Sequence, residues 1–331
     1  MHTHPYLKLI VLNLALMLLS GCNAAAETPA SEVAAQPPTL TAAEPTPSPD
    51  PLGEVKSISL EIQQEFQQLP EGVPLPIEEV VQRTLAQVGV QVVDQGQPSD
   101  ATLTFNLMFN PLAAEIKTGL GTVTCYNGAE VTGQMTLSLP DQPPIVEPIQ
   151  NVNPVETMFL IGCPTIAEAP YAEIWPRAVL EPLVKIWDHA LLLKAIEDED
   201  PAIRKQAVSL LADHQPEPPE AVDGLLKALQ DQDVDVFLYA ATALGQRKET
   251  AAVPFLITAL KNEEKRFYAI IALRDLGPGA IEAVPDLIQV LEDEGVIDWQ
   301  KREAQDTLKE ITGQDLGEDP IAWKEWWQKQ Q

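Results

Sequence analysis

The chain has 331 residues, with 49 acidic and 21 basic side chains and a formal net charge of −28 at pH 7. This excess of acid argues against nucleic acid as a partner, because binding phosphate requires neutralisation by Lys and Arg. It also argues against a protein that lies flat on anionic lipid, and its simplest consequence is solubility.

The first 21 residues have the layout of a secretory signal peptide. Lys8 precedes an apolar run, residues 9–19. This run is too short to span a hydrocarbon core, which needs about 20 residues. We therefore expect the segment at 1–21 to be removed on export.

Leu19-Ser20-Gly21-Cys22 resembles the lipobox of bacterial lipoproteins. The resemblance implies cleavage before Cys22 and attachment of lipid to its sulfur. Lipid chains would then hold the protein on the cell membrane or the outer membrane, on the periplasmic side. Asn23 is not the aspartate often linked to inner-membrane retention, which favours the outer membrane. The alternative is an ordinary signal peptide with an unrelated cysteine.

Residues 22–54 are rich in Pro and Ala, and residues 23–53 contain no aromatic side chain. Such a segment buries too little apolar surface to offset the entropy of ordering it. We expect a disordered tether that begins at the lipidated cysteine.

Residues 55–170 are predicted to form an α+β domain. Strand-like runs lie at 55–60, 90–93 and 101–109, and an amphipathic helix is expected at 76–89. Asn127-Gly128 predicts a hairpin turn between two further strands, because both residues tolerate positive φ. The expected fold is an antiparallel sheet of four or five strands with one helix against it. The helix–strand–strand order is similar to small α+β domains of envelope lipoproteins.

Cys125 and Cys163 remain once Cys22 is assigned to the lipid anchor. Outside the cytoplasm an even number of cysteines is typical of disulfides, so we hypothesise that these two pair. Two buried free thiols are the alternative.

Residues 171–331 contain an internal repeat. The segment at 192–200 recurs at 225–233, and the segment at 221–229 recurs at 252–260 and 283–291. Each unit reads as helix, acidic turn, helix, which predicts an α-α solenoid of about four units. The segment at 170–188, with Pro176 and Pro182, is expected to join the two domains.

The repeats resemble short HEAT-like repeats of the PBS-lyase type. Asp200-Pro201-Ala202-Ile203-Arg204 matches that family's Asp-Pro-x-Val-Arg pattern, whereas the next copy has Phe237 in place of Arg204. The C-terminal tail is similar to the ends of other bacterial HEAT-like chains. We interpret Trp323, Trp326 and Trp327 as a C-terminal cap, with an aromatic binding platform as the alternative.

Carboxylates gather at the turns between the two helices of each repeat. Stacking the repeats should align them in a ridge that attracts a basic partner or weakly holds divalent cations. The alternative is local, because carboxylates stabilise helix N-termini. The residues of this hypothetical acidic ridge are Asp198, Asp200, Asp231, Asp233, Asp235, Glu263, Glu264 and Asp293.

We find no catalytic constellation, and we assign no metal site, cofactor or small-molecule substrate. After residue 21 the chain has two histidines, His189 and His214, neither at metal-ligand spacing from a partner, and it has no glycine-rich phosphate loop. Tyr239, Tyr268 and Trp299 are candidates for the concave face of the solenoid or for its core.

The expected function is therefore that of a non-catalytic, membrane-anchored scaffold that binds a protein in the cell envelope. A structural subunit of an envelope assembly complex is one alternative. The other is an enzyme similar to phycobilin lyases, which also carry short HEAT-like repeats. Those enzymes act in the cytoplasm, which the export signal contradicts.

Overall fold

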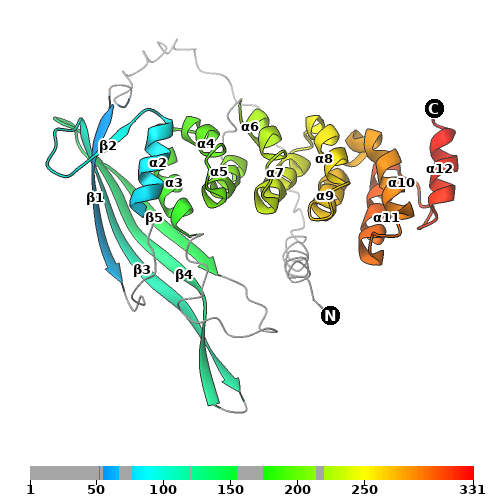
Figure 1. The fold of residues 1–331 in the computed structure, drawn as a ribbon, viewed down its shortest axis with the longest axis horizontal. Helices are drawn as coiled ribbons and strands as arrows, with labels where there is room; N and C mark the ends of the chain where they lie inside the picture. Colours follow the sequence, from blue (N-terminus) through cyan, green and yellow to red (C-terminus); the bar gives the residue numbers. More distant parts are fainter. Residues whose placement is uncertain (1–51, 53–54, 67–76, 119–120, 155–173, 214–219) are drawn as a thin grey trace, which may run out of the picture.

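The computed structural model describes residues 52, 55–66, 77–118, 121–154, 174–213 and 220–331. A sheet stands at one end, and a row of helix pairs extends from it to the C-terminus (Figure 1). The predicted signal peptide, Cys22, the predicted tether apart from Leu52, Cys163 and His214 lie outside the described residues. The side chain of Cys125, in the fourth strand, is not described either. The lipidation and the disulfide therefore remain predictions.

The sheet has five strands in the order β2-β1-β3-β4-β5. It is mixed rather than antiparallel as expected, because β1 runs parallel to both β2 and β3, while β3, β4 and β5 alternate in direction. The reason is the crossover through helix α2 (Ile77–Gln87), which returns the chain in the direction of β1. The strands are β1 (Ser57–Phe66), β2 (Gln91–Val93), β3 (Ala101–Thr118), β4 (Gly121–Ser138) and β5 (Ile145–Pro154).

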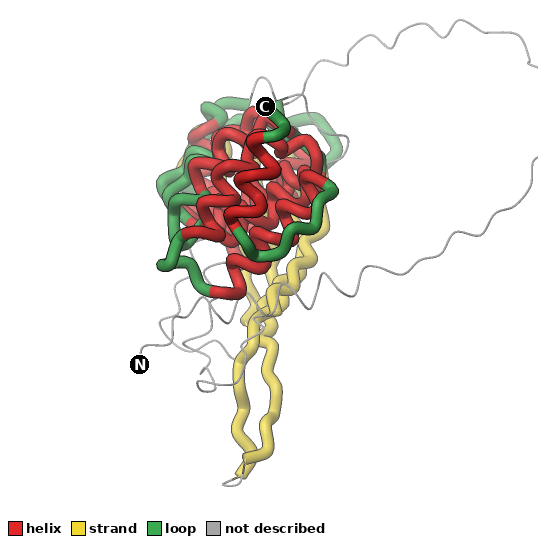
Figure 2. The backbone as a smooth tube through the Cα atoms, turned by 90° about the vertical axis from the view of Figure 1, so that its right-hand side faces the viewer, coloured by secondary structure: helices red, strands yellow, loops and turns green. Residues whose placement is uncertain are grey.

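The hairpin prediction at Asn127-Gly128 is wrong, because both residues lie inside β4. Leu112 pairs with Gly128 and Ala113 pairs with Tyr126, so Asn127 is the extra residue of a β-bulge. The strands β3 and β4 continue past this bulge and reach beyond the rest of the sheet as a long arm (Figure 2). Residues that tolerate unusual backbone angles suit a bulge as well as a turn.

One face of the sheet carries the core of the first domain. The alternation predicted for the third strand is confirmed, because Leu103, Phe105 and Phe109 are fully or almost fully buried. Helix α2 buries the predicted face, including Val81 and Leu85. Helix α3 (Ile174–Trp187) packs on β5 and β4 and also on the first repeat, so it joins the two regions as expected.

The solenoid follows as two rows of helices (Figure 1). The second helices of successive repeats pack directly on one another, α5 on α7, α7 on α9 and α9 on α11. The first helices are α4 (Ala190–Ala195), α6 (Ala221–Ala228), α8 (Val253–Ala259) and α10 (Val284–Glu292). The second helices are α5 (Pro201–Asp213), α7 (Val234–Gln246), α9 (Arg266–Leu276) and α11 (Asp298–Thr312).

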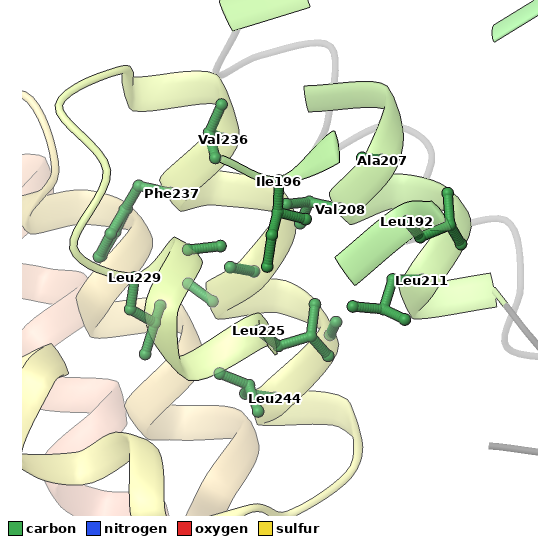
Figure 3. Packing of buried hydrophobic residues seen from close by; sticks show 14 of the residues in the cluster. Leu192, Ile196, Ala207, Val208, Leu211, Leu225, Leu229, Val236, Phe237 and Leu244 are labelled. Carbon is green, nitrogen blue, oxygen red and sulfur yellow. The ribbon is translucent and has the colours of Figure 1, made fainter. Parts of the chain in front are cut away.

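Apolar side chains from neighbouring repeats form one continuous core. Figure 3 shows Ile196 and Val208 of one repeat beside Leu225 and Val236 of the next. Leu225, Leu256 and Leu287 occupy equivalent positions and are all fully buried, as the repeat predicts. One helix pair cannot cover its own apolar face, so each repeat depends on its neighbours.

Helix α12 (Pro320–Gln328) closes the far end by packing on α10. Trp323 is fully buried, and its indole Nε1–H donates to the carbonyl of Gly317 over 2.8 Å. Trp326 and Trp327 are only partly buried against the same core. Trp323 therefore acts as the anchor of the cap.

We expect Trp323→Phe to lower the free energy of unfolding by about 1–2 kcal/mol, because it removes buried volume and one hydrogen bond. Thermal unfolding followed by circular dichroism measures this. Trp326→Phe is the matched control, with a change below about 0.5 kcal/mol. Equal losses in the two variants would contradict the anchoring role of Trp323.

Candidate functional surface of the repeats

The turn between the two helices of each repeat carries an Asp or Asn at the same position. Asp198, Asp231, Asn262 and Asp293 follow one another at spacings of 33, 31 and 31 residues. In each turn the side-chain oxygen accepts the backbone N–H two residues further on, over 2.8–2.9 Å. This bond closes the turn before the second helix. Part of the acidic ridge thus has a local structural role.

Asp198 lies at the junction of the sheet domain with the repeats. Its side chain is only 2% exposed. It accepts hydrogen bonds from Arg83 Nη2 and Gln87 Nε2 of α2, both over 2.5 Å. This carboxylate therefore connects the first repeat to the helix of the sheet domain, a contact that the sequence did not predict.

Asp231 is held by the neighbouring repeat. Arg204 reaches it with two bonds, Nε to Oδ2 over 2.7 Å and Nη2 to Oδ1 over 2.9 Å. Burial raises the pKa of Asp231, but the bonds from Arg204 and from the backbone N–H of Asp233 lower it more, so the net shift is downward. The hydrogen bond to Asp231 also raises the pKa of the Arg204 guanidinium. This explains the arginine of the repeat pattern.

Phe237 stands where the next repeat would carry such an arginine, and it is fully buried. Lys265 of the following repeat lies over its ring, with 5.2 Å between Nζ and the ring centroid, and it also binds the carbonyl of Asp231. A cation thus still joins adjacent turns, but Lys265 belongs to the repeat that follows, whereas Arg204 reaches Asp231 from the repeat that precedes it.

Of the remaining carboxylates in and beside the acidic ridge, some form ion pairs or are half-buried, and others are exposed. Glu197, their neighbour, pairs with Lys227 over 2.5 Å, and Asp235 lies 3.5 Å from Lys205 Nζ. Asp200 and Asp233 are half-buried, whereas Glu263, Glu264 and Asp293 are exposed. Within the described part of the chain, no group of three or more His, Cys, Asp or Glu residues could hold a metal ion. The hypothesis that the acidic ridge holds divalent cations therefore finds no set of ligands among those residues.

The second helices present a different surface, which we call the inner stripe. One end of the stripe is formed by Tyr239 of α7, which is 40% exposed. Ile271 of α9 and Glu303 of α11 follow at intervals of 32 residues and are partly exposed. The full stripe comprises Tyr239, Thr242, Ile271, Arg274, Glu303 and Asp306.

An ion pair joins two members of the inner stripe, with 2.9 Å between Arg274 Nη1 and Glu303 Oε2. Of the aromatic candidates, Tyr239 lies on the stripe, whereas Tyr268 is only 9% exposed. Trp299 packs edge-on against Phe267, with 4.9 Å between ring centroids. The sequence analysis did not predict Ile271 and Arg274, although they follow Tyr239 and Thr242, respectively, at a spacing of 32 residues.

Asp275 lies in α9 next to the inner stripe. Burial raises the pKa of this carboxyl, although Arg274 and Lys248 oppose the shift. A carboxylate with a raised native pKa contributes full stability below its unfolded pKa of about 3.9 and loses it as the pH rises through the native value.

We therefore expect Asp275→Asn to stabilise the protein at pH 7 and to have no such effect near pH 3. Urea unfolding at the two pH values tests this. Asp223→Asn, at an exposed position of α6, serves as the control. A gain of equal size at both pH values would contradict the electrostatic cause.

His189 is placed beside acidic groups rather than in a catalytic set. Its Nδ1 lies 2.7 Å from Asp188 Oδ1, and its Nε2 lies 3.5 Å from Glu220 Oε2.

None of the described helices has the length and apolar character needed to cross a membrane.

Residues 190–277 match the family of HEAT repeats. This match covers the first three helix pairs, from α4 to α9, and confirms the prediction of HEAT repeats. The described chain is therefore a mixed sheet with a helix, followed by a HEAT-repeat solenoid. No match was found among the curated proteins with which the sequence was compared.

Three of the similar solved structures cover between 38% and 45% of this chain. The complex of CpcE and CpcF of phycocyanin lyase from Nostoc sp. PCC7120 is 23% identical, with 38% of this chain and 53% of that chain covered and a TM-score of 0.33. The chain thus spans about half the length of that lyase chain.

The other two similar structures are engineered. One engineered protein is 23% identical over 43% of this chain and 72% of its own, with a TM-score of 0.32. A designed armadillo repeat protein in complex with the peptide (KR)4 is 17% identical over 45% and 85%, with a TM-score of 0.28.

Proposed function

We propose that this protein is a non-catalytic lipoprotein of the cell envelope, anchored through Cys22, whose HEAT-repeat solenoid binds another protein through the inner stripe. The observation that carries the proposal is the exposure of Tyr239 on α7, within the row of second helices. Tyrosine is enriched at binding hot spots, since it combines a large apolar ring with a polar end.

The surroundings of Tyr239 support a protein partner. Ile271 continues the apolar surface, and the pair of Arg274 and Glu303 supplies charge beside it. An apolar centre with a polar rim is the usual arrangement of a protein interface. The tether would allow the solenoid to reach a partner at some distance from the membrane.

Photocrosslinking in intact cells tests the binding surface. A photoreactive amino acid at position 239 should give a discrete adduct that contains a second protein. The same group at position 223, on the exposed side of α6, should give none. Equal labelling from the two positions, or none from position 239, would count against the inner stripe.

The anchor has its own test. Cys22→Ser should abolish incorporation of labelled palmitate and shift the protein from the membrane to the soluble fraction. Incorporation that persists in Cys22→Ser would exclude this residue as the lipidated one, whatever the outcome of the crosslinking.

A further inference from the structure

Among the described residues, β2 covers only the first part of one edge of β1. β2 pairs with Ser57, Ile58 and Ser59 only, whereas β1 continues to Phe66. On its other side β1 is paired with β3 all the way from Ile58 to Phe66. Among the described strands, none lies beside the second half of β1 on the side of β2.

The backbone bonds show which groups of β1 face this edge. Gln91 N–H donates to the carbonyl of Lys56 over 2.8 Å, and Gln95 Nε2 donates to the carbonyl of Leu60 over 3.4 Å. Asp100 N–H instead donates to the carbonyl of Ser57, on the side of β3. Even-numbered residues therefore direct their N–H and C=O groups to the open edge, and the next in line are those of Ile62 and Gln64.

The opposite edge of the sheet carries two prolines, whereas the described residues of the β1 edge include none. β5 carries Pro148 and Pro154, and proline lacks the N–H that an added strand needs. β1 has the sequence SISLEIQQEF, without proline or lysine. Natural sheets usually blunt such an edge, so an edge without protection indicates a place where another strand adds.

Charge and polarity define the strand that would fit. Leu60 and Ile62 point toward the core side, while Glu61 and Gln63 are exposed on the outer face. The outer neighbours of these two in β3 are Thr104 and Asn106, which carry no charge. An added strand would extend the core with apolar residues and would face Glu61 with a basic residue.

A second copy of the chain fits this edge poorly. An antiparallel pair centred on Gln63 would place Glu61 of one copy opposite Glu65 of the other. Like charges in directly opposed positions destabilise a strand pair. The overall charge of −28 adds to this repulsion.

We propose that the β1 edge from Glu61 to Phe66 binds an extended segment of another protein, in which basic and apolar residues alternate, by β-strand addition. This site is independent of the inner stripe. It would give the protein two binding surfaces, one on the sheet and one on the solenoid.

The test uses the full-length chain in detergent and a labelled peptide, Lys-Val-Lys-Ile-Lys-Val-Lys, followed by fluorescence anisotropy at about 0.15 M salt, which screens non-specific attraction. A peptide of the same composition with its lysines and apolar residues in separate blocks is the peptide control. We expect the alternating peptide to bind at least about tenfold more tightly than the block peptide.

Two substitutions at one position isolate the backbone contact. Gln64→Pro removes an N–H that faces the open edge, and binding should weaken at least about tenfold. Gln64→Ala retains the N–H and should bind as the unmodified protein does. Glu61→Lys, which leaves the backbone intact, should also weaken binding, so the proposal stays testable if Gln64→Pro fails to fold.

Three outcomes would overturn the proposal. The first is equal affinity for the alternating and the block peptide, which would indicate simple charge attraction. The second is binding that Gln64→Ala reduces as much as Gln64→Pro does. The third is a dimer in sedimentation that Gln64→Pro dissociates, which would place a second copy at this edge.

Discussion

Gly133→Val is expected to destabilise the protein by at least about 4 kcal/mol or to prevent folding of the sheet domain. Gly133 lies in β4 with φ of +151°, and a Cβ atom there would stand 1.9 Å from the backbone oxygen of Asn106 in β3. Neither backbone can move without breaking the register between the two strands. Backbone strain and steric overlap act together at this position.

Urea unfolding followed by circular dichroism measures the effect, and Thr132→Val is the matched control. Thr132 is the adjacent residue of β4, and its side chain is partly exposed on the outer face. The control should change the free energy of unfolding by less than about 1 kcal/mol. A Gly133→Val protein with unchanged stability would show that β3 and β4 do not approach as closely as described.

Asp198→Ala is expected to lower the free energy of unfolding by about 3 kcal/mol, with a fall in Tm of roughly 6–12 °C. The change removes the acceptor of Gln87 and the closer of the two carboxylates that Arg83 contacts, the other being Glu79 at 3.7 Å. It also removes the bond that closes the first turn of the solenoid. Because these bonds join α2 to the repeats, the sheet and the solenoid should then unfold in separate steps.

Differential scanning calorimetry measures both effects of Asp198→Ala. The matched control is Glu199→Ala, since Glu199 is exposed and the carbonyl that binds Arg204 remains. Adding Arg83→Met to Asp198→Ala should restore part of the lost stability, because it removes a charge that has lost its closest partner. A single cooperative transition with unchanged Tm would show that Asp198 does not couple the two regions.

The core and the repeat type could be predicted from the sequence because they depend on local periodicity. The spacing of 31–33 residues placed Leu225, Leu256 and Leu287 in the core, and all three are buried. The alternation from Ala101 to Phe109 likewise gave the buried face of β3. In a periodic pattern the same burial is predicted at equivalent positions of several repeats, so a single departure such as Phe237 does not change the predicted repeat.

Strand direction and the role of Asn127-Gly128 were predicted wrongly for a common physical reason. The alternation of side chains is the same in parallel and antiparallel strands, so it cannot give direction. Only the crossover through α2 decides that β1 and β2 are parallel. Only the full length of β3 and β4 turns an expected hairpin into a bulge.

The sequence by itself determined that this protein is acidic, repetitive and built from helix pairs, because composition and period are local properties. The tertiary structure decided which carboxylates face solvent. Asp198 and Glu263 both belong to turns rich in acid, yet one is buried between two domains and the other is exposed. Burial depends on partners far away in the chain, such as Arg83, and no local pattern specifies those partners.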